Sequence, residues 1–183
     1  TGARSRQESE LTREAELSLA ELNLKNGRHE EALEKFVTAL CLSPQVDMVI
    51  LDRIEELIER ARFKDPDPLL RAGLYFHEHQ DQPKAVFFLS HALQIAPDNS
   101  EVIEAQENIY RDILSKNPDL PKVRLELGRL YLQSGRAEQS IEHLKLAKAA
   151  PNLAQEAGRL LAEAFDEAGQ LTRALDQYRA LPI

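Results

Sequence analysis

Four segments of the chain repeat one spacing of small, large and helix-ending residues, and this repetition restricts the fold more than any other feature. In segment 27–44, Ala32, Phe36 and Ala39 lie four and three residues apart, so they share one helical face. Pro44 follows five residues later and ends the helix. The spacing recurs with Ala85, Leu89 and Ala92 before Pro97, with Ser140, Leu144 and Ala147 before Pro151, and with Ala174 and Tyr178. A fixed repeat of this kind predicts a stack of similar units.

A second amphipathic helix is predicted before each of these segments. Each of these preceding helices carries a small residue at an equivalent place: Ala20, Gly73, Gly128 and Ala162. A small residue on each of two antiparallel helices allows close approach. The large neighbours predicted to fill the remaining space are Leu19, Leu22, Phe76, Leu127, Tyr131, Leu161 and Phe165. The left-handed turn between the two helices suits glycine, and Gly27, Gly135 and Gly169 occupy it in three of the four copies.

This pattern resembles the tetratricopeptide repeat, a 34-residue helix–turn–helix unit. The resemblance covers residues 13–46, 66–99, 121–153 and a truncated copy at 155–183. It implies an all-α fold, an α-α superhelix of about ten helices. The sequence departs from the family pattern at Gln80, where glycine is usual, at Pro151, which comes one residue early, and in having no tryptophan.

Two extra helices are predicted between the first three copies, at residues 47–64 and 100–117. The first has an apolar stripe through Ile50, Ile54 and Leu57, and Glu56 and Arg60 are spaced for an ion pair. In the second, Asn99 or Ser100 is a suitable N-cap, and residues 106–118 look like the second helix of a repeat that lacks its first. Residues 11–183 are therefore predicted to form one repeat domain. Residues 1–10 have no apolar stripe and are expected to be a disordered tail or an expression remnant.

Composition excludes several classes of protein. Apolar residues make up 43% of the chain, too many for a disordered protein. The net charge is −8, and residues 1–65 and 66–183 each carry −4, so no basic surface for nucleic acid or anionic membranes is predicted. Cys41 is the single cysteine and is expected to be a buried small hydrophobe. No run of about 20 apolar residues is present, so this segment is not expected to insert into a membrane. The cytoplasm is favoured if no leader has been removed.

Catalytic and metal-binding patterns were sought and are weak. His77 and His79 are two residues apart, whereas a helical metal pair needs a spacing of four; His91 lies in the next predicted helix. The acidic pairs Glu30–Glu31 and Glu55–Glu56 are typical of solvated faces. The sequence therefore predicts no enzyme, no cofactor and no metal.

The resemblance implies a protein or peptide partner, because first helices line the concave face of such stacks. The residues predicted to form the partner-binding groove are Leu17, Glu21, Leu24, Leu70, Leu74, His77, Leu125, Arg129 and Leu132, followed by the mixed, acidic set Arg159, Glu163 and Asp166. Family members that bind chaperone tails hold a carboxylate with a Lys/Asn/Arg clamp. The matching places here are Leu17, Glu21, Leu70 and Arg71, so such a tail is not the expected ligand. An apolar or amphipathic helix suits a leucine groove better.

Three alternatives remain open at this stage. The groove leucines could pack against the two extra helices, which would close the groove. The chain could form homo-oligomers through an uncapped C-terminal end, since it stops at Leu181, Pro182 and Ile183 inside a second helix. It could also be the docking or regulatory arm of a larger, possibly enzymatic protein.

Overall fold

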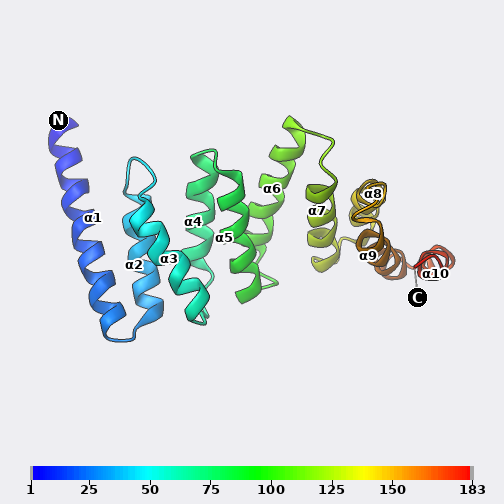
Figure 1. The fold of residues 1–183 in the computed structure, drawn as a ribbon, viewed down its shortest axis with the longest axis horizontal. Coiled ribbons are helices and arrows are strands. Elements are labelled where there is room, and N and C mark those ends of the chain that lie inside the picture. The colour runs from blue at the N-terminus through cyan, green and yellow to red at the C-terminus, as the bar shows by residue number, and fades with distance from the viewer. Residues whose placement is uncertain (1, 182–183) are drawn as a thin grey trace. The chain divides into compact units, whose positions relative to one another are not determined.

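The computed structural model describes residues 2–181, and this range contains ten α-helices (Figure 1). They are α1 (Gly2–Lys25), α2 (His29–Cys41), α3 (Met48–Arg60), α4 (Asp67–Glu78), α5 (Gln82–Ile95), α6 (Ser100–Lys116), α7 (Pro121–Gln133), α8 (Ala137–Lys148), α9 (Ala154–Glu167) and α10 (Leu171–Arg179). No strand occurs within residues 2–181. The predicted all-α fold is confirmed, and Pro182 and Ile183 lie outside the described residues.

The chain divides into two compact units, Thr1–Val102 and Ile103–Ile183, where the sequence predicts one domain. The boundary falls inside α6, so unit 1 contains α1 to α5 and unit 2 contains α7 to α10. Each unit is described by itself.

Unit 1 is built around α2. Helix α1 packs against α2, α2 also contacts α3 and α4, and α4 forms a hairpin with α5. The predicted inward face of α2 is buried, with Ala32 and Ala39 fully covered and Phe36 1% exposed. The stacked rings of Phe76 and Phe88, 5.3 Å apart, join α4 to α5. The core of unit 1 therefore follows the small and large positions of the sequence repeat.

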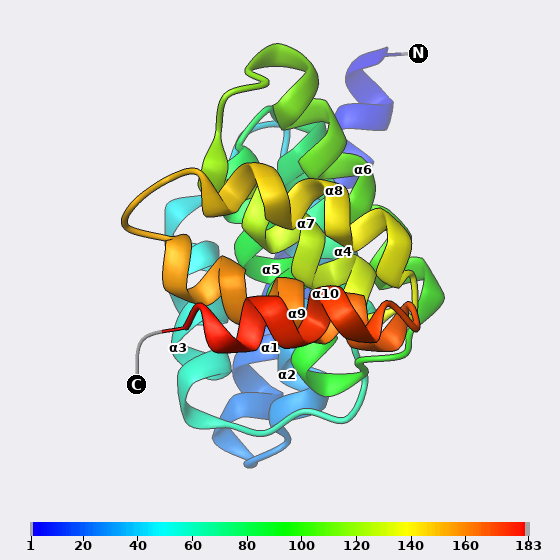
Figure 2. The same cartoon turned by 90° about the vertical axis from the view of Figure 1, so that its right-hand side faces the viewer.

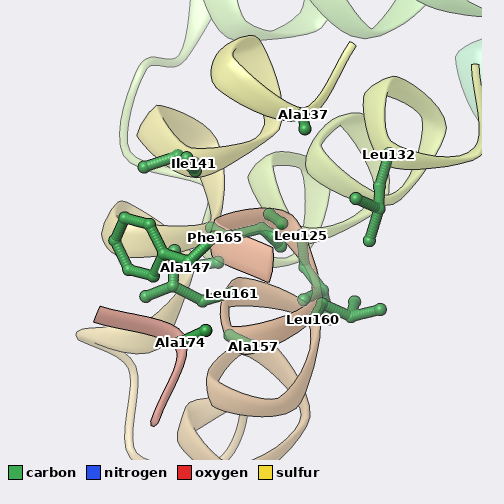
Figure 3. Packing of buried hydrophobic residues seen from close by; sticks show 12 residues of the cluster. Leu125, Leu132, Ala137, Ile141, Ala147, Ala157, Leu160, Leu161, Phe165 and Ala174 are labelled. Atoms are coloured by element: carbon green, nitrogen blue, oxygen red, sulfur yellow. The ribbon is translucent and has the colours of Figure 1, made fainter. Parts of the chain in front are cut away.

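Unit 2 contains two helical hairpins in succession. Helix α7 pairs with α8, α9 pairs with α10, and α9 also packs against both helices of the preceding hairpin. Figure 3 shows the apolar cluster that joins them, with Ile141 of α8, Leu161 and Phe165 of α9 and Ala174 of α10 directed toward one another. Each hairpin thus contributes one layer, and α9 packs against the face of α8 that points away from α7.

Close approach at the small residues is confirmed in both units. A Cβ atom added to Gly73 would lie 2.7 Å from the Cγ of Leu89, and one added to Gly128 would lie 2.8 Å from the Cγ of Leu144. The fully buried Ser140 hydroxyl donates a hydrogen bond of 2.7 Å to the Gly128 carbonyl. These distances leave no room for a larger residue, so the register read from the sequence is correct.

The turns between paired helices share one backbone conformation. Gly27, Gly135 and Gly169 have φ angles of 70°, 71° and 71°, and Gln80 has 62°. In the first of these turns the Arg28 N–H donates to the Asn23 carbonyl at 2.9 Å, and equivalent bonds close the other three. Gln80 therefore adopts the left-handed conformation that glycine adopts in the other copies.

The two extra helices are present as predicted. Asp47 caps α3, since its side chain accepts the Val49 N–H at 3.0 Å, and the Glu56–Arg60 ion pair forms at 2.5 Å. Asn99 caps α6 by accepting the Glu101 N–H at 3.0 Å. Along α3, the stripe of Ile50, Ile54 and Leu57 is buried.

Several expectations are wrong. Residues 2–10 belong to α1, because Arg, Gln and Glu favour a helix without needing to be buried. Cys41 is exposed, because Val37 and Leu40 occupy the buried face of α2 and one further residue turns the side chain about 100° away. Other residues expected to be core are exposed in part because no described helix of their unit covers them: Leu19 and Leu22 of α1 and Tyr178 of α10.

Candidate partner-binding surface

The predicted groove residues of α1 are half-buried. Leu17 and Leu24 lie beside the buried Ala20, which faces α2. Glu21 forms an ion pair with Arg53 of α3, with 3.6 Å between Oε1 and Nε. Arg13 of α1 also binds Asp47, the capping residue of α3, at 2.9 Å. Two ion pairs therefore connect α1 with α3 and its capping residue, one of them through the predicted groove residue Glu21.

The predicted groove residues of α4 differ from one another in exposure. Leu70 is only 8% exposed, whereas Leu74, one turn later, is 41% exposed. His77 is half-buried, and its Nδ1 lies 3.1 Å from Oε1 of Gln82. Leu74 is therefore the member of this set with the largest free apolar surface.

Arg71 is the cation nearest to Leu74 on α4 and is already bound within the unit. Its guanidinium donates to Glu34 Oε1 at 2.7 Å and to Thr38 Oγ1 at 2.8 Å, both on α2. The Arg71 and Glu34 side chains are about 40% exposed, so the pair is worth about 0–1 kcal/mol. It fixes α4 on α2 and does not present a free cation to a carboxylate ligand.

In unit 2 the predicted groove leucines belong to the core. Leu125 is 2% exposed and Leu132 is 8% exposed, and both are part of the apolar cluster in Figure 3. Arg129, between them, is half-buried and pairs with Glu126 of α7 and Glu156 of α9. Of the nine predicted residues, Leu125 and Leu132 belong to this internal cluster.

A buried polar cluster in unit 2 was not found by sequence reasoning. Glu107 of α6 is 8% exposed and binds three partners: Arg111 at 2.7 Å, Arg136 at 2.7 Å and the Tyr131 hydroxyl, which donates at 3.1 Å. The Arg136 guanidinium also lies 4.5 Å from the centre of the Tyr131 ring. Burial raises the pKa of Tyr131 above its ordinary value, with Glu107 acting in the same direction and Arg111 opposing it. The Glu107–Arg111 spacing of four was the only sequence signal for this cluster, which attaches α6 to the α7–α8 hairpin.

The histidines weighed for metal binding do not converge. The Nδ1 of His79 lies 2.8 Å from the Tyr75 carbonyl, and His91 contacts the Phe87 ring. Within residues 2–181, no three His, Cys, Asp or Glu side chains are placed to hold one metal ion. Over the same range, no helix is both long enough and apolar enough to cross a bilayer.

Comparison with known families gives a direct match in unit 2. Residues 104–153 match the family model described as tetratricopeptide repeat. The chain carries a tetratricopeptide repeat. The match includes most of α6 together with the α7–α8 hairpin.

Comparison with solved structures finds a MamA protein at 13% identity and a TM-score of 0.41, covering 92% of this chain and 88% of that chain. The structure titled MamA AMB-1 P212121 has 19% identity and a TM-score of 0.41, covering 94% and 88%. A MamA fragment from Desulfovibrio magneticus RS-1 has 16% identity and a TM-score of 0.37, covering 92% of each chain. A comparison with curated protein sequences finds no match.

The tetratricopeptide repeat at residues 104–153 indicates the general class of function. Stacked helical hairpins present extended surfaces to other proteins, and proteins of this fold are generally non-catalytic scaffolds. The matched repeat supports a protein–protein interaction scaffold as the general function of the chain.

Proposed function

We propose that the chain binds an amphipathic partner helix on the face of α4 that carries Leu74. The observation that carries this proposal is a leucine 41% exposed in the middle of a helix whose other apolar side chains are buried. An exposed leucine on a rigid first helix is the kind of anchor that helix-in-groove recognition uses. Leu17 and Leu24 of α1 add partly exposed apolar area in the same unit.

The proposal concentrates binding in unit 1 because of the burial pattern. Leu125 and Leu132 have little area to offer a partner, so a leucine-lined surface is supported only by the residues of α1 and α4. The Glu21–Arg53 pair favours partial cover of α1 by α3, which makes α4 the main contact. The chain has a net charge of −8, and this favours a partner whose polar face is basic, since attraction raises the association rate.

The test compares three variants by thermal melting and by capture of partners from native lysate. Leu74→Glu is expected to keep the melting temperature and lose the partner, because it puts a charge where an apolar contact is desolvated. Val49→Glu is the matched control, because Val49 lies on α3 and is 73% exposed; it should keep both properties. Leu70→Glu should lower the melting temperature, because Leu70 is buried. Capture of the same partners in equal amounts by Leu74→Glu and Val49→Glu would contradict the proposal.

A further inference from the structure

The outer face of α10 is apolar and open. Leu171, Leu175 and Tyr178 are 62%, 53% and 43% exposed, and they lie four and three residues apart on one side of the helix. In Figure 2, which looks at unit 2 from this end, no other helix of the unit is drawn over α10. In this unit's described residues, α9 is the helix that packs against α10, on the side of the buried Ala174.

The preceding hairpin shows what covers such a face. Gly169 follows Gly135 by 34 residues, so Leu171 and Leu175 correspond to Ala137 and Ile141 of α8. Ala137 and Ile141 are 8% and 6% exposed and belong to the apolar cluster in which α9 packs against α8 (Figure 3). The open face of α10 therefore corresponds to a face that a first helix buries one repeat earlier.

Helix α1 is a first helix with a matching face that is also open. Aligning Ala20 of α1 with Ala162 of α9 brings four positions of α1 into correspondence with the α9 cap residue and three positions of α9: Leu11, Ala15, Leu19 and Leu22 with Leu153, Ala157, Leu161 and Ala164. On α9 this stripe faces α8 and is covered, with Leu161 3% exposed and Ala164 fully buried. On α1 the same stripe lies opposite the buried Ala20, which faces α2, and Leu11 and Leu22 are 61% and 51% exposed.

We infer that α10 of one copy binds α1 of a second copy, with α1 taking the place that α9 takes on α8. A second copy fits as the occupant because the chain itself supplies both faces of the contact, in the positions that the α8–α9 contact uses. Such a contact joins two different surfaces, so it is head-to-tail and can repeat from copy to copy. This inference does not use the Leu74 face and is independent of the proposed function.

Light scattering on two single variants and their mixture tests the inference. Leu22→Glu disables the α1 face and leaves α10 intact, whereas Leu175→Glu does the reverse. The unaltered protein should show a mass that rises with concentration. Each variant alone should remain a monomer, and an equal mixture should form a dimer through the one intact pair of faces. Both residues are more than half exposed, so the melting temperature of each variant should match the unaltered protein and verify the fold.

Three outcomes would overturn the inference. The first is an unaltered protein that stays monomeric as its concentration is raised. The second is a Leu22→Glu variant that self-associates as the unaltered protein does, which would indicate a contact between like faces. The third is a mixture that stays monomeric. Leu74→Glu serves as a further control and should self-associate normally, so failure of this inference is separable from failure of the proposed function.

Discussion

At the scale of single residues, Gln80 has the most unusual backbone in the chain. It has a φ of 62°, and it is the only non-glycine residue with a positive φ among residues 2–181. A side chain in the left-handed region costs about 1–2 kcal/mol, and a glycine at this position would remove that cost. The greater conformational freedom of glycine in the unfolded chain offsets part of this gain in stability. Gln80→Gly is therefore expected to raise the free energy of unfolding by about 1 kcal/mol, measured by chemical denaturation.

Gly135→Ala is the reciprocal control for the Gln80 prediction. Apart from its two chain neighbours, no residue places a heavy atom within 4 Å of a Cβ built on Gly135, so the backbone conformation is what opposes alanine. The free energy of unfolding of Gly135→Ala should be lower than that of the unaltered protein by about 1 kcal/mol. A Gln80→Gly variant that is less stable than the unaltered protein would show that the Gln80 side chain contributes more than its backbone strain costs.

His143 of α8 makes stability depend on pH. Burial lowers the pKa of His143, Arg124 adds to this effect, and Nδ1 has no hydrogen-bond partner among the described residues. Because the folded pKa lies below the unfolded value of about 6.5, the unfolded chain takes up the proton first as pH falls. The stability present above pH ~6.5 is therefore lost progressively below it.

His143→Gln removes this proton uptake, so the free energy of unfolding should fall less steeply as pH is lowered through ~6.5. Denaturation curves at a series of pH values measure the slope. His91→Gln is the comparison variant in unit 1, because burial lowers the pKa of His91 as well. His91 therefore also makes the free energy of unfolding fall as the pH is lowered. Identical slopes for His143→Gln and the unaltered protein would contradict the assignment.

At the scale of paired helices, Gly128 determines how closely α7 and α8 approach. Even a Cβ atom at this position would lie 2.8 Å from Leu144. Gly128→Leu overpacks the contact and should lower the free energy of unfolding by about 1–3 kcal/mol. Thermal melts should show a larger loss for Gly128→Leu than for Gly135→Ala, and equal small losses would mean that the helix register is wrong.

The Glu107 cluster attaches an unpaired helix to a hairpin. Glu107→Gln leaves Arg111 and Arg136 without a counter-charge and should cost about 1–2 kcal/mol, a value reduced because Arg111 is 56% exposed. Combined with Arg136→Gln, the loss should be smaller than the two single losses added together, because both act on one network. Glu138→Gln, at an exposed position of α8, is the control and should change little. Additive losses would show that the Glu107–Arg136 contact is weak in solution.

Most of the helices, the Asn99 cap and the helix-pair contacts could be predicted from the sequence because each depends on neighbours at fixed spacing. Gly128 against Ser140, and Asn99 as a cap, are examples. The Glu107 cluster could not be predicted, because Tyr131 and Arg136 lie more than twenty residues from Glu107 in the sequence. The exposure of Leu19, Leu22 and Tyr178 was also missed, because the same apolar stripe is core when a neighbouring helix covers it and surface when none does.

At the scale of the whole molecule, the chain joins two compact units through α6, and each unit has its own core. Spacing predicts which residues share a helical face, but not how much of that face a neighbour covers. Leu70 and Leu125 occupy equivalent positions of the repeat and are 8% and 2% exposed, whereas Leu74, which corresponds to Arg129, is 41% exposed. The burial of unit 2 leucines is what moves the proposed binding surface to unit 1.

Site-specific photo-crosslinking tests the central claim, binding at the Leu74 face, most directly. A photo-reactive amino acid replaces Leu74 in one variant and Val49, the exposed α3 control, in another. After illumination in native lysate, the variant modified at position 74 should form a discrete covalent adduct with a partner protein. The variant modified at position 49 should not form that adduct. The same adduct in equal yield from both positions, or from position 49 alone, would contradict the account.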